Sequence, residues 1–240
     1  MKTASPKTSP SPRSRHGIRG ALESKAPHKR AFDDYRRFVR KHYDGFPGKL
    51  TAFTGVVTGH DTLAGRLFSA DGFDVRGCKR ILDAACGNGR YTRFVLRQAD
   101  RDAMVTGFDY SQGMLRRARH RLKHTRATHV AADITRLPYL DASFDAIICG
   151  WVLEHLPDPR PGLRELARVL KPGGKVLLMT TEDTFLGSVC SRLWHCRTYN
   201  RAVLRKVCEE SGLCWQRELW FTKLHAVAKL GGIVVELCRA

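Results

Sequence analysis

The sequence predicts an α/β fold in which a parallel β-sheet carries helices on both faces. Apolar, strand-like runs alternate with helical patterns from Cys78 onward, and this order favours a parallel sheet with right-handed crossovers. The run ILDAACGNGRYT at 81–92 joins an apolar strand to a helix through a glycine turn. The 240 residues, of which 42% are hydrophobic, suffice for one medium-sized domain with extensions.

The chain before this domain divides into a tail and a helical part. Residues 1–28 are rich in Ser, Pro, Lys and Arg, and we predict a disordered basic tail because this composition cannot bury a core. Residues 31–43 have helical spacing of apolar side chains, and 50–68 are predicted as a second helical region. We expect residues 29–72 to pack as a helical cap over a domain formed by residues 73–240.

Strands and helices alternate through the domain. The predicted strands span 79–84, 103–109, 127–132, 143–149 and 173–181, and the predicted helices span 89–98, 111–122 and 160–170. The sequence KPGG at 171–174 is a helix stop and a turn into the fifth strand. The remainder is predicted as a connection over 183–197, a helix at 199–211, and strands at 213–221 and 224–237, the last with a bulge at Gly231-Gly232.

Composition limits the partners and the compartment. A net charge of +19 and a pI near 10.1 suggest a negatively charged partner, such as nucleic acid, anionic lipid or an acidic metabolite. The eight cysteines form no C-x-x-C pair and the ten histidines are scattered, so we expect reduced thiols and no metal site. The N-terminus has no apolar core like that of a signal peptide, and no run of about 18 apolar residues could span a membrane. We therefore expect a cytoplasmic protein, with peripheral contact to an anionic membrane as an open alternative.

The glycine turn predicts a ligand site. Gly87 and Gly89 would let a nucleotide-like ligand lie against bare backbone. Asp109 ends the next strand about 20 residues later, a distance at which a carboxylate can accept both ribose hydroxyls. Thr92 stands where a dinucleotide site has its third glycine, and the Gly-Lys-Ser/Thr of a P-loop is absent. The loop therefore suits an adenosine ligand without a pyrophosphate, such as S-adenosylmethionine.

Four motifs in a fixed order resemble the class I S-adenosylmethionine-dependent methyltransferases, in particular the type 11 group, which includes quinone C-methylases. They are ILDAACGNGRYT, VTGFDYSQGMLRRAR, AADITRLPYLDASFDAIICGWVLEHLPDP and LRELARVLKPGGKVLLMTTED, and they lie within residues 78–183. The resemblance implies a Rossmann-like three-layer sandwich. Its seven-stranded, mostly parallel sheet would have the order 3-2-1-4-5-7-6, with strand 7 antiparallel.

The resemblance also implies a methyl-donor site at the carboxyl ends of the strands. The residues expected to bind S-adenosyl-L-methionine are Asp83, Ala85, Gly87, Gly89, Asp109, Tyr110, Met114, Asp133, Ile134 and Gly150. Asp109 would hold the ribose hydroxyls, and Asp133 would accept from the adenine amino group. Met114 lies at helical spacing, so core packing explains it equally well. Ala85 departs from the family, which often has glycine there.

Candidates on the acceptor side are fewer. Glu154 and His155 are the candidate catalytic residues, because an imidazole can take a proton near neutral pH. The Glu-His pair is common across the family whatever the acceptor, so a structural role in the loop after the fourth strand is favoured. Trp151, Tyr43 and His195 are candidate substrate contacts, each with packing as an alternative.

The leading hypothesis is an enzyme that transfers a methyl group from S-adenosylmethionine to a small or lipophilic acceptor at O, N or C. Because the sulfonium methyl is already activated, alignment and exclusion of water would supply most of the catalysis. An RNA or protein methyltransferase is an alternative that rests on the charge of +19. Nucleic acid is less favoured, because the sequence shows no added RNA-binding module. A non-catalytic S-adenosylmethionine-binding protein is the third hypothesis.

Overall fold

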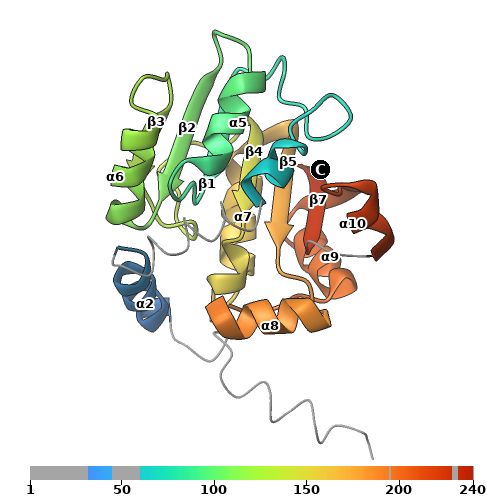
Figure 1. Cartoon of the computed structure of the whole chain (residues 1–240). Helices are drawn as coiled ribbons and strands as arrows, with labels where there is room; N and C mark the ends of the chain where they lie inside the picture. Colours follow the sequence, from blue (N-terminus) through green and yellow to red (C-terminus); the bar gives the residue numbers. More distant parts are fainter. Residues whose placement is uncertain (1–31, 45–59, 195, 229–231, 240) are drawn as a thin grey trace, which may run out of the picture.

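The computed structural model describes residues 32–44, 60–194, 196–228 and 232–239 (Figure 1). Within these residues, seven strands form one sheet of order β3-β2-β1-β4-β5-β7-β6. The strands are β1 (Arg80–Ala84), β2 (Met104–Asp109), β3 (Thr128–Ala131), β4 (Phe144–Gly150), β5 (Leu170–Thr180), β6 (Leu213–Glu218) and β7 (Ile233–Arg239). Strand β7 is antiparallel to both of its neighbours. The predicted fold, strand order and direction are confirmed.

Helices surround this sheet. They are α2 (Phe32–Asp44), α4 (His60–Gly65), α5 (Arg90–Gln98), α6 (Gln112–Arg121), α7 (Arg160–Val169), α8 (Phe185–Trp194), α9 (Arg201–Glu210) and α10 (Lys223–Ala228), with a 3-10 turn η3 (Leu153–His155). Two of them start at side-chain caps that the sequence supplies. Ser111 accepts from Met114 N at the start of α6, and Asn200 accepts from two backbone N–H groups at the start of α9.

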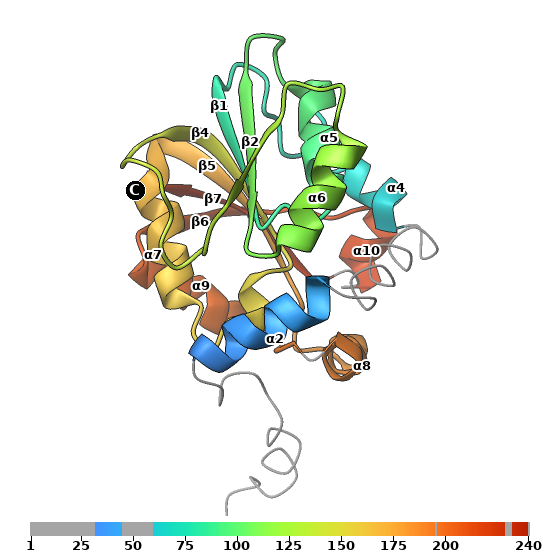
Figure 2. The ribbon, with the colours of Figure 1, turned by 90° about the vertical axis from the view of Figure 1, so that its left-hand side faces the viewer.

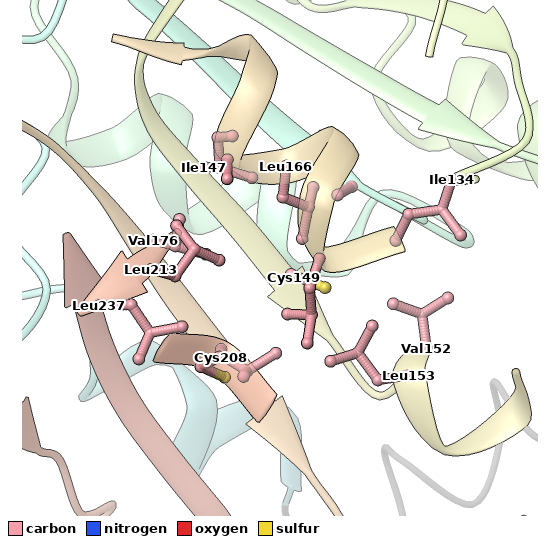
Figure 3. Packing of buried hydrophobic residues seen from close by; sticks show 14 of the residues in the cluster. Ile134, Ile147, Cys149, Val152, Leu153, Leu166, Val176, Cys208, Leu213 and Leu237 are labelled. Carbon is pink, nitrogen blue, oxygen red and sulfur yellow. The ribbon is translucent and has the colours of Figure 1, made fainter. Parts of the chain in front are cut away.

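The core consists of two apolar clusters, one on each face of the sheet. Alternate residues of a strand enter opposite clusters, as Ile147 and Ile148 of β4 do. Helices α7 and α9 cover one face, where Leu166 and Cys208 pack against β4 and β5 (Figure 3). Helices α4 and α5 cover the other face, where Phe94 stacks on Phe68. Because both faces are buried, the strands read as nearly continuous apolar runs.

One predicted connection is a helix. Residues 183–197 were predicted as a connection without an assigned helix, and α8 occupies most of this range. Gly187, which weakens the helical pattern in the sequence, is needed inside α8. A Cβ at this position would lie 1.9 Å from the carbonyl oxygen of Glu182. The glycine therefore permits a close approach between the helix and the end of the preceding strand.

The predicted strand at 224–237 is also wrong in its first half. Residues Lys223–Ala228 form α10, and the final strand begins only at Ile233. Gly232 has φ +79 and lies before β7, so the expected bulge inside the strand is not observed. A Cβ at Gly232 would lie 2.5 Å from Thr180 O and 3.2 Å from the Trp151 ring. This crowding, together with the positive φ, explains the glycine.

The described parts of the predicted cap lie in two places. Helix α2 confirms the predicted helix at 31–43 and contacts α6. Helix α4 contacts α5 instead, so the second helical region contributes to the core. Residues 1–31 and 45–59, which include the predicted tail and most of that second region, lie outside the described residues. The domain boundary between 72 and 73 stays a prediction.

Two further features concern membranes and metals. In the part of the chain that the structure describes, no helix combines the length and the apolar character that crossing a bilayer requires. The same residues contain no cluster of three His, Cys, Asp or Glu side chains arranged to hold a metal ion.

Candidate functional site

The loop between β1 and α5 is shaped by backbone that L-residues rarely adopt. Ala85, Gly87 and Gly89 have φ values of 55, 54 and 78. A Cβ at Gly89 would lie 2.7 Å from Cδ1 of Leu122, so this glycine also permits close packing. A Cβ at Gly87 would meet nothing within 4 Å, so open space lies in front of its backbone. The left-handed backbone at Ala85 costs about 1 kcal/mol or more and explains why glycine suits this position.

Two aspartates fix this loop through hydrogen bonds. The carboxylate of Asp83 is 1% exposed and accepts a hydrogen bond from the Thr92 hydroxyl. Burial raises the pKa of Asp83 to about 7, against the effect of that hydrogen bond. Asp109 accepts from the backbone N–H of Gly87 and of Ser111, both at 2.8 Å. Asp109 is 9% exposed, and each of its two carboxylate oxygens accepts one of these hydrogen bonds.

Asp133 is held by two segments. Its Oδ1 accepts from the backbone N–H and the hydroxyl of Thr135, at 2.9 and 2.7 Å. Its Oδ2 accepts from Nε of Arg36 in α2 at 2.9 Å. Burial opposes the charged form, but these hydrogen bonds outweigh it and lower the pKa of Asp133. The neighbouring Ile134 is 5% exposed and belongs to the core. Tyr110 lies close enough to Arg36 for their electrostatic interaction to contribute to the raised pKa of Arg36.

The end of β4 and the residue after it are tightly packed. A Cβ at Gly150 would lie 2.9 Å from the Tyr91 ring and 3.0 Å from the methyl group of Met179. Trp151 has φ 58, and its indole donates to the Tyr91 hydroxyl at 2.7 Å. The Trp151 ring packs against the same cluster as α4 and α5. Packing and this hydrogen bond thus account for Trp151, and contact with an acceptor stays a prediction.

Tyr43 and His155 meet across 112 residues of sequence. The Tyr43 hydroxyl lies 3.1 Å from Nε2 of His155, and the two rings form an edge-to-face pair with centroids 5.8 Å apart. Arg117 of α6 donates to the Tyr43 carbonyl at 3.0 Å and to Sδ of Met114 at 3.4 Å. One residue predicted for catalysis and one predicted for substrate contact are therefore brought together. His195 lies outside the described residues.

Glu154 points into the core, away from the Tyr43–His155 pair. Its side chain accepts from the hydroxyls of Thr180 and Thr181, at 2.6 and 2.9 Å, and from the backbone N–H of Thr181 at 3.3 Å. Burial raises the pKa of Glu154 to about 7. Because both carboxylate oxygens are engaged in fixing the end of β5, the structural interpretation of Glu154 is supported.

Comparisons with known proteins relate the central part of the chain to a known domain family. Residues 82–178 match the type 11 family of the methyltransferase domain. The demethylmenaquinone methyltransferase of Clavibacter sepedonicus is 44% identical over 101 residues, which are 42% of this chain and 40% of that protein. The ubiquinone/menaquinone biosynthesis C-methyltransferase UbiE of Desulfotalea psychrophila is 33% identical over 144 residues, 60% of this chain and 58% of that protein. Residues 82–178 therefore carry a methyltransferase domain that is similar to the type 11 group of class I S-adenosylmethionine-dependent methyltransferases.

The similarity extends to solved structures. Magnesium protoporphyrin IX methyltransferase (ChlM) from Synechocystis, with bound SAH, aligns with a TM-score of 0.66 at 18% identity, over 85% of this chain and 100% of that chain. At this identity the likeness shows the fold alone. Because the methyltransferase spans only about two fifths to three fifths of the two curated relatives, their acceptors are a basis for proposals only.

S-adenosylmethionine is the cofactor of this methyltransferase, and the residues present fit it. The open space in front of Gly87 admits a ligand against the backbone. Asp109 ends β2 and Asp133 follows β3, at the edge of the sheet where doubly wound folds bind ligands. Asp109 would hold the ribose and Asp133 the adenine amino group. The assignment of each predicted cofactor contact stays a prediction, including Met114, which is 7% exposed.

Sequence reasoning missed two groups that shape the methyltransferase site. Thr92 was noted only as a replacement for glycine, but its hydroxyl binds Asp83. The available signal was the position of Thr92 in the first turn of the helix that follows the acid-bearing strand, where a hydroxyl can face that acid. Arg36 was not singled out, because nothing in a basic N-terminal helix marks one arginine as the partner of an aspartate 97 residues away.

Proposed function

We propose that this methyltransferase methylates a lipophilic hydroxyaromatic acceptor of the demethylmenaquinone type, and that Tyr43 and His155 handle the acceptor proton. The hydrogen bond between the Tyr43 hydroxyl and Nε2 of His155 carries this proposal. It joins α2 to the turn after β4, beside the carboxyl ends of the strands. The names of the relatives support the acceptor class, since two of them refer to menaquinone or its demethylated precursor.

The chemistry requires a base on the acceptor side. When bound, S-adenosylmethionine supplies an activated methyl group. A hydroxylated aromatic ring becomes a stronger carbon nucleophile when its hydroxyl proton is removed, so the acceptor reacts in its reduced, dihydroxy form. In our proposal the acceptor's hydroxyl proton passes to Tyr43, and the proton of Tyr43 passes to Nε2 of His155. After the new carbon–carbon bond forms, the ring C–H proton leaves to water and His155 returns its proton to the acceptor oxygen.

The same pair would also serve methylation of a hydroxyl oxygen. In that case the proton stays on His155 until it leaves to water, and the acceptor oxygen carries the methyl group. Analysis of the methylated product separates the two reactions. An RNA or protein acceptor is supported by the net charge of the chain alone, and no contact among the described residues gives it further support. These acceptors therefore serve as comparison substrates.

The test is hydroxyl deletion at Tyr43. We expect Tyr43→Phe to lower kcat for a short-chain demethylmenaquinol by about 100-fold, the lower range for loss of a general acid or base. His155→Gln should cost a similar factor. The double variant should lose little more, because the two residues act as one unit. Calorimetric titration should give wild-type affinity for S-adenosylmethionine in all three variants.

Tyr139→Phe is the matched control. Tyr139 is a partly buried tyrosine that packs edge-to-face on Phe144 at the start of β4, and within the described ranges it forms no hydrogen bond or ring pair with Tyr43 or His155. Among the described residues its hydroxyl has no hydrogen-bond partner. If Tyr43→Phe and Tyr139→Phe retain the same kcat, the proton-transfer role of the pair is wrong.

A further inference from the structure

Helix α8 exposes a group of large apolar side chains. Phe185 is 88% exposed, Leu186 52% and Val189 48%. Phe185 and Val189 are four residues apart and therefore share one face of the helix, with Leu186 beside them. The buried Gly187 lies on the side that approaches Glu182. Neighbouring exposed apolar side chains of this size mark a surface that contacts something else.

This helix is anchored to the acceptor side of the site at both of its ends. Before α8, the hydroxyl and the backbone N–H of Thr181 donate to the side chain of Glu154. After α8, Arg197 N donates to Glu154 O at 2.9 Å, and the Tyr199 hydroxyl donates to Leu153 O at 2.8 Å. An isolated β-bridge between Glu182 and Tyr199 joins the residues before and after α8. The turn that anchors α8 is thus the one that carries His155.

The figures agree on where α8 lies. Figures 1 and 2 show α8 and α2 at the end of the sheet toward which β5 points. This is the carboxyl end of the parallel strands, where the donor and acceptor sites are expected. The exposed side chains of α8 therefore belong to the same end of the molecule as Tyr43 and His155.

The charge within and directly after α8 is positive, although Glu182 and the exposed Asp183 precede the helix. Between Thr184 and Cys208 the sequence contains no Asp or Glu. It contains Arg192 and Arg197, and three further cations that pair with glutamates, Arg201, Arg205 and Lys206. Arg192 is exposed and lies seven residues after Phe185, on the same helix face. Of the acids just before α8, Glu182 is already paired with Arg201 at 2.8 Å. Apolar side chains flanked by cations complement the interface of an anionic bilayer.

We propose that α8 docks this methyltransferase on the surface of an anionic lipid bilayer, with Phe185, Leu186 and Val189 among the lipid headgroups. The inference rests on the proposed function, since it places the acceptor side of the site against the phase in which a lipophilic acceptor dissolves. The acceptor ring can then reach the Tyr43–His155 pair while its apolar chain remains in the membrane. Three apolar side chains and a few cations give reversible, salt-dependent binding rather than permanent anchoring.

The test is co-sedimentation of the full-length protein with vesicles. One set contains phosphatidylcholine and phosphatidylglycerol in equal parts, and the other contains phosphatidylcholine alone. We expect binding to the anionic set, and at least about tenfold weaker binding for the double variant Phe185→Ser/Leu186→Ser, which loses two interfacial side chains. Leu140→Ser is the matched control, because Leu140 is 83% exposed but lies in the turn before β4, at the other end of the sheet. This control should bind like the wild type.

A second variant keeps the test valid if the two serines of the first variant unfold α8. Val189→Asp keeps the flanking apolar residues and places an anion against the lipid phosphates, so it should also bind at least about tenfold more weakly. Wild-type binding that neither variant weakens would overturn the docking role of α8 and assign the attraction to charge elsewhere. Absence of wild-type binding to the anionic vesicles at low salt would overturn it as well. Binding to a protein rather than to either vesicle set would identify α8 as a protein interface instead.

A parallel assay separates this inference from the proposed function. With a short-chain acceptor in free solution, the docking variants should turn over at the wild-type rate, while with acceptor embedded in anionic vesicles they should be slower. If the wild type does not methylate the soluble acceptor, the proposed function fails whatever the vesicles show. If soluble turnover is normal and the vesicle assay shows no difference among the variants, only the docking inference fails.

Discussion

Two buried carboxyl groups hold the backbone at the carboxyl ends of neighbouring strands. Asp83 lies near the end of β1, just before the glycine loop, and Glu154 lies in the turn after β4. Both side chains are nearly inaccessible to water. Each accepts hydrogen bonds from threonine hydroxyls, Thr92 for Asp83 and Thr180 with Thr181 for Glu154. A buried carboxyl group without such donors would cost several kcal/mol. The threonines therefore make the acids tolerable, and the acids fix two loops of the site.

The raised pKa of Glu154 gives a testable pH dependence. Its pKa lies at about 7 in the folded protein, against 4.5 ordinarily. Between these values the folded state binds more protons than the unfolded state, so this group's contribution to stability falls as pH rises toward 7. Relative to wild type, Glu154→Gln should therefore gain about 2–3 kcal/mol of unfolding free energy between pH 4.5 and pH 8. Urea denaturation at both pH values measures this, and a pH-independent difference would contradict the burial argument.

At the residue scale, the sequence predicted the part of the site that local motifs define. The glycine loop and Asp109 follow from one strand–turn–helix pattern, because their spacing alone limits what can fit. The contacts of Tyr43 and Arg36 could not be predicted in the same way. Their partners His155 and Asp133 lie 112 and 97 residues away, and helical periodicity does not report which distant group a side chain meets.

At the element scale, α2 is held by contacts to three other segments. Arg36 binds Asp133 after β3, the Tyr43 hydroxyl binds His155 in η3, and the Tyr43 carbonyl accepts from Arg117 of α6. These contacts place α2 over residues predicted to bind adenine and acceptor. Helix α2 is thus the element through which donor and acceptor sides are connected.

Arg36 and Arg37 allow a matched test of that attachment. Each pairs with an aspartate three residues earlier in α2, but among the ion pairs of the described residues Arg36 also binds Asp133, which lies outside the helix. A partly exposed ion pair contributes roughly 0.5–1 kcal/mol. We therefore expect Arg36→Ala to speed amide hydrogen exchange in residues 32–44 by about two- to fivefold, and Arg37→Ala to leave it near wild type. Equal exchange in both variants would show that the Asp133 contact does not hold the helix.

The elements that the sequence missed share a cause. Helix α8 contains Gly187, and the chain around α10 has glycines and alternating apolar residues, so local patterns indicated a loop and a strand. In the structure Gly187 serves a close approach to Glu182 O, and Gly232 serves one to Thr180 O. The contact of Gly232 is tertiary and spans 52 residues, so no short window of sequence contains it. The contact of Gly187 spans only five residues, but a glycine by itself does not report that a helix will form around it. The sheet itself was predictable because its strands are long apolar runs between clear turns.

At the scale of the whole molecule, donor binding and folding are linked. The donor loops connect β1 with α5 and β2 with α6, and they tie together elements from both apolar clusters. A ligand that binds only the folded protein stabilises it by RT ln(1 + [L]/Kd), or about 2.7 kcal/mol at a concentration roughly 100 times Kd. For a chain of this length we expect S-adenosylmethionine or S-adenosylhomocysteine to raise Tm by roughly 5–10 °C.

NAD is the informative comparison ligand for this experiment, which needs only thermal unfolding of the full-length protein. It shares the adenosine of S-adenosylmethionine but adds a pyrophosphate, and this chain has the buried Thr92 where dinucleotide sites have the glycine that lets helix and strand pack closely. NAD should therefore leave Tm unchanged. An equal rise with NAD would mean that the loop recognises adenosine alone, and no rise with either sulfur ligand would contradict the donor site drawn from Gly87, Asp109 and Asp133.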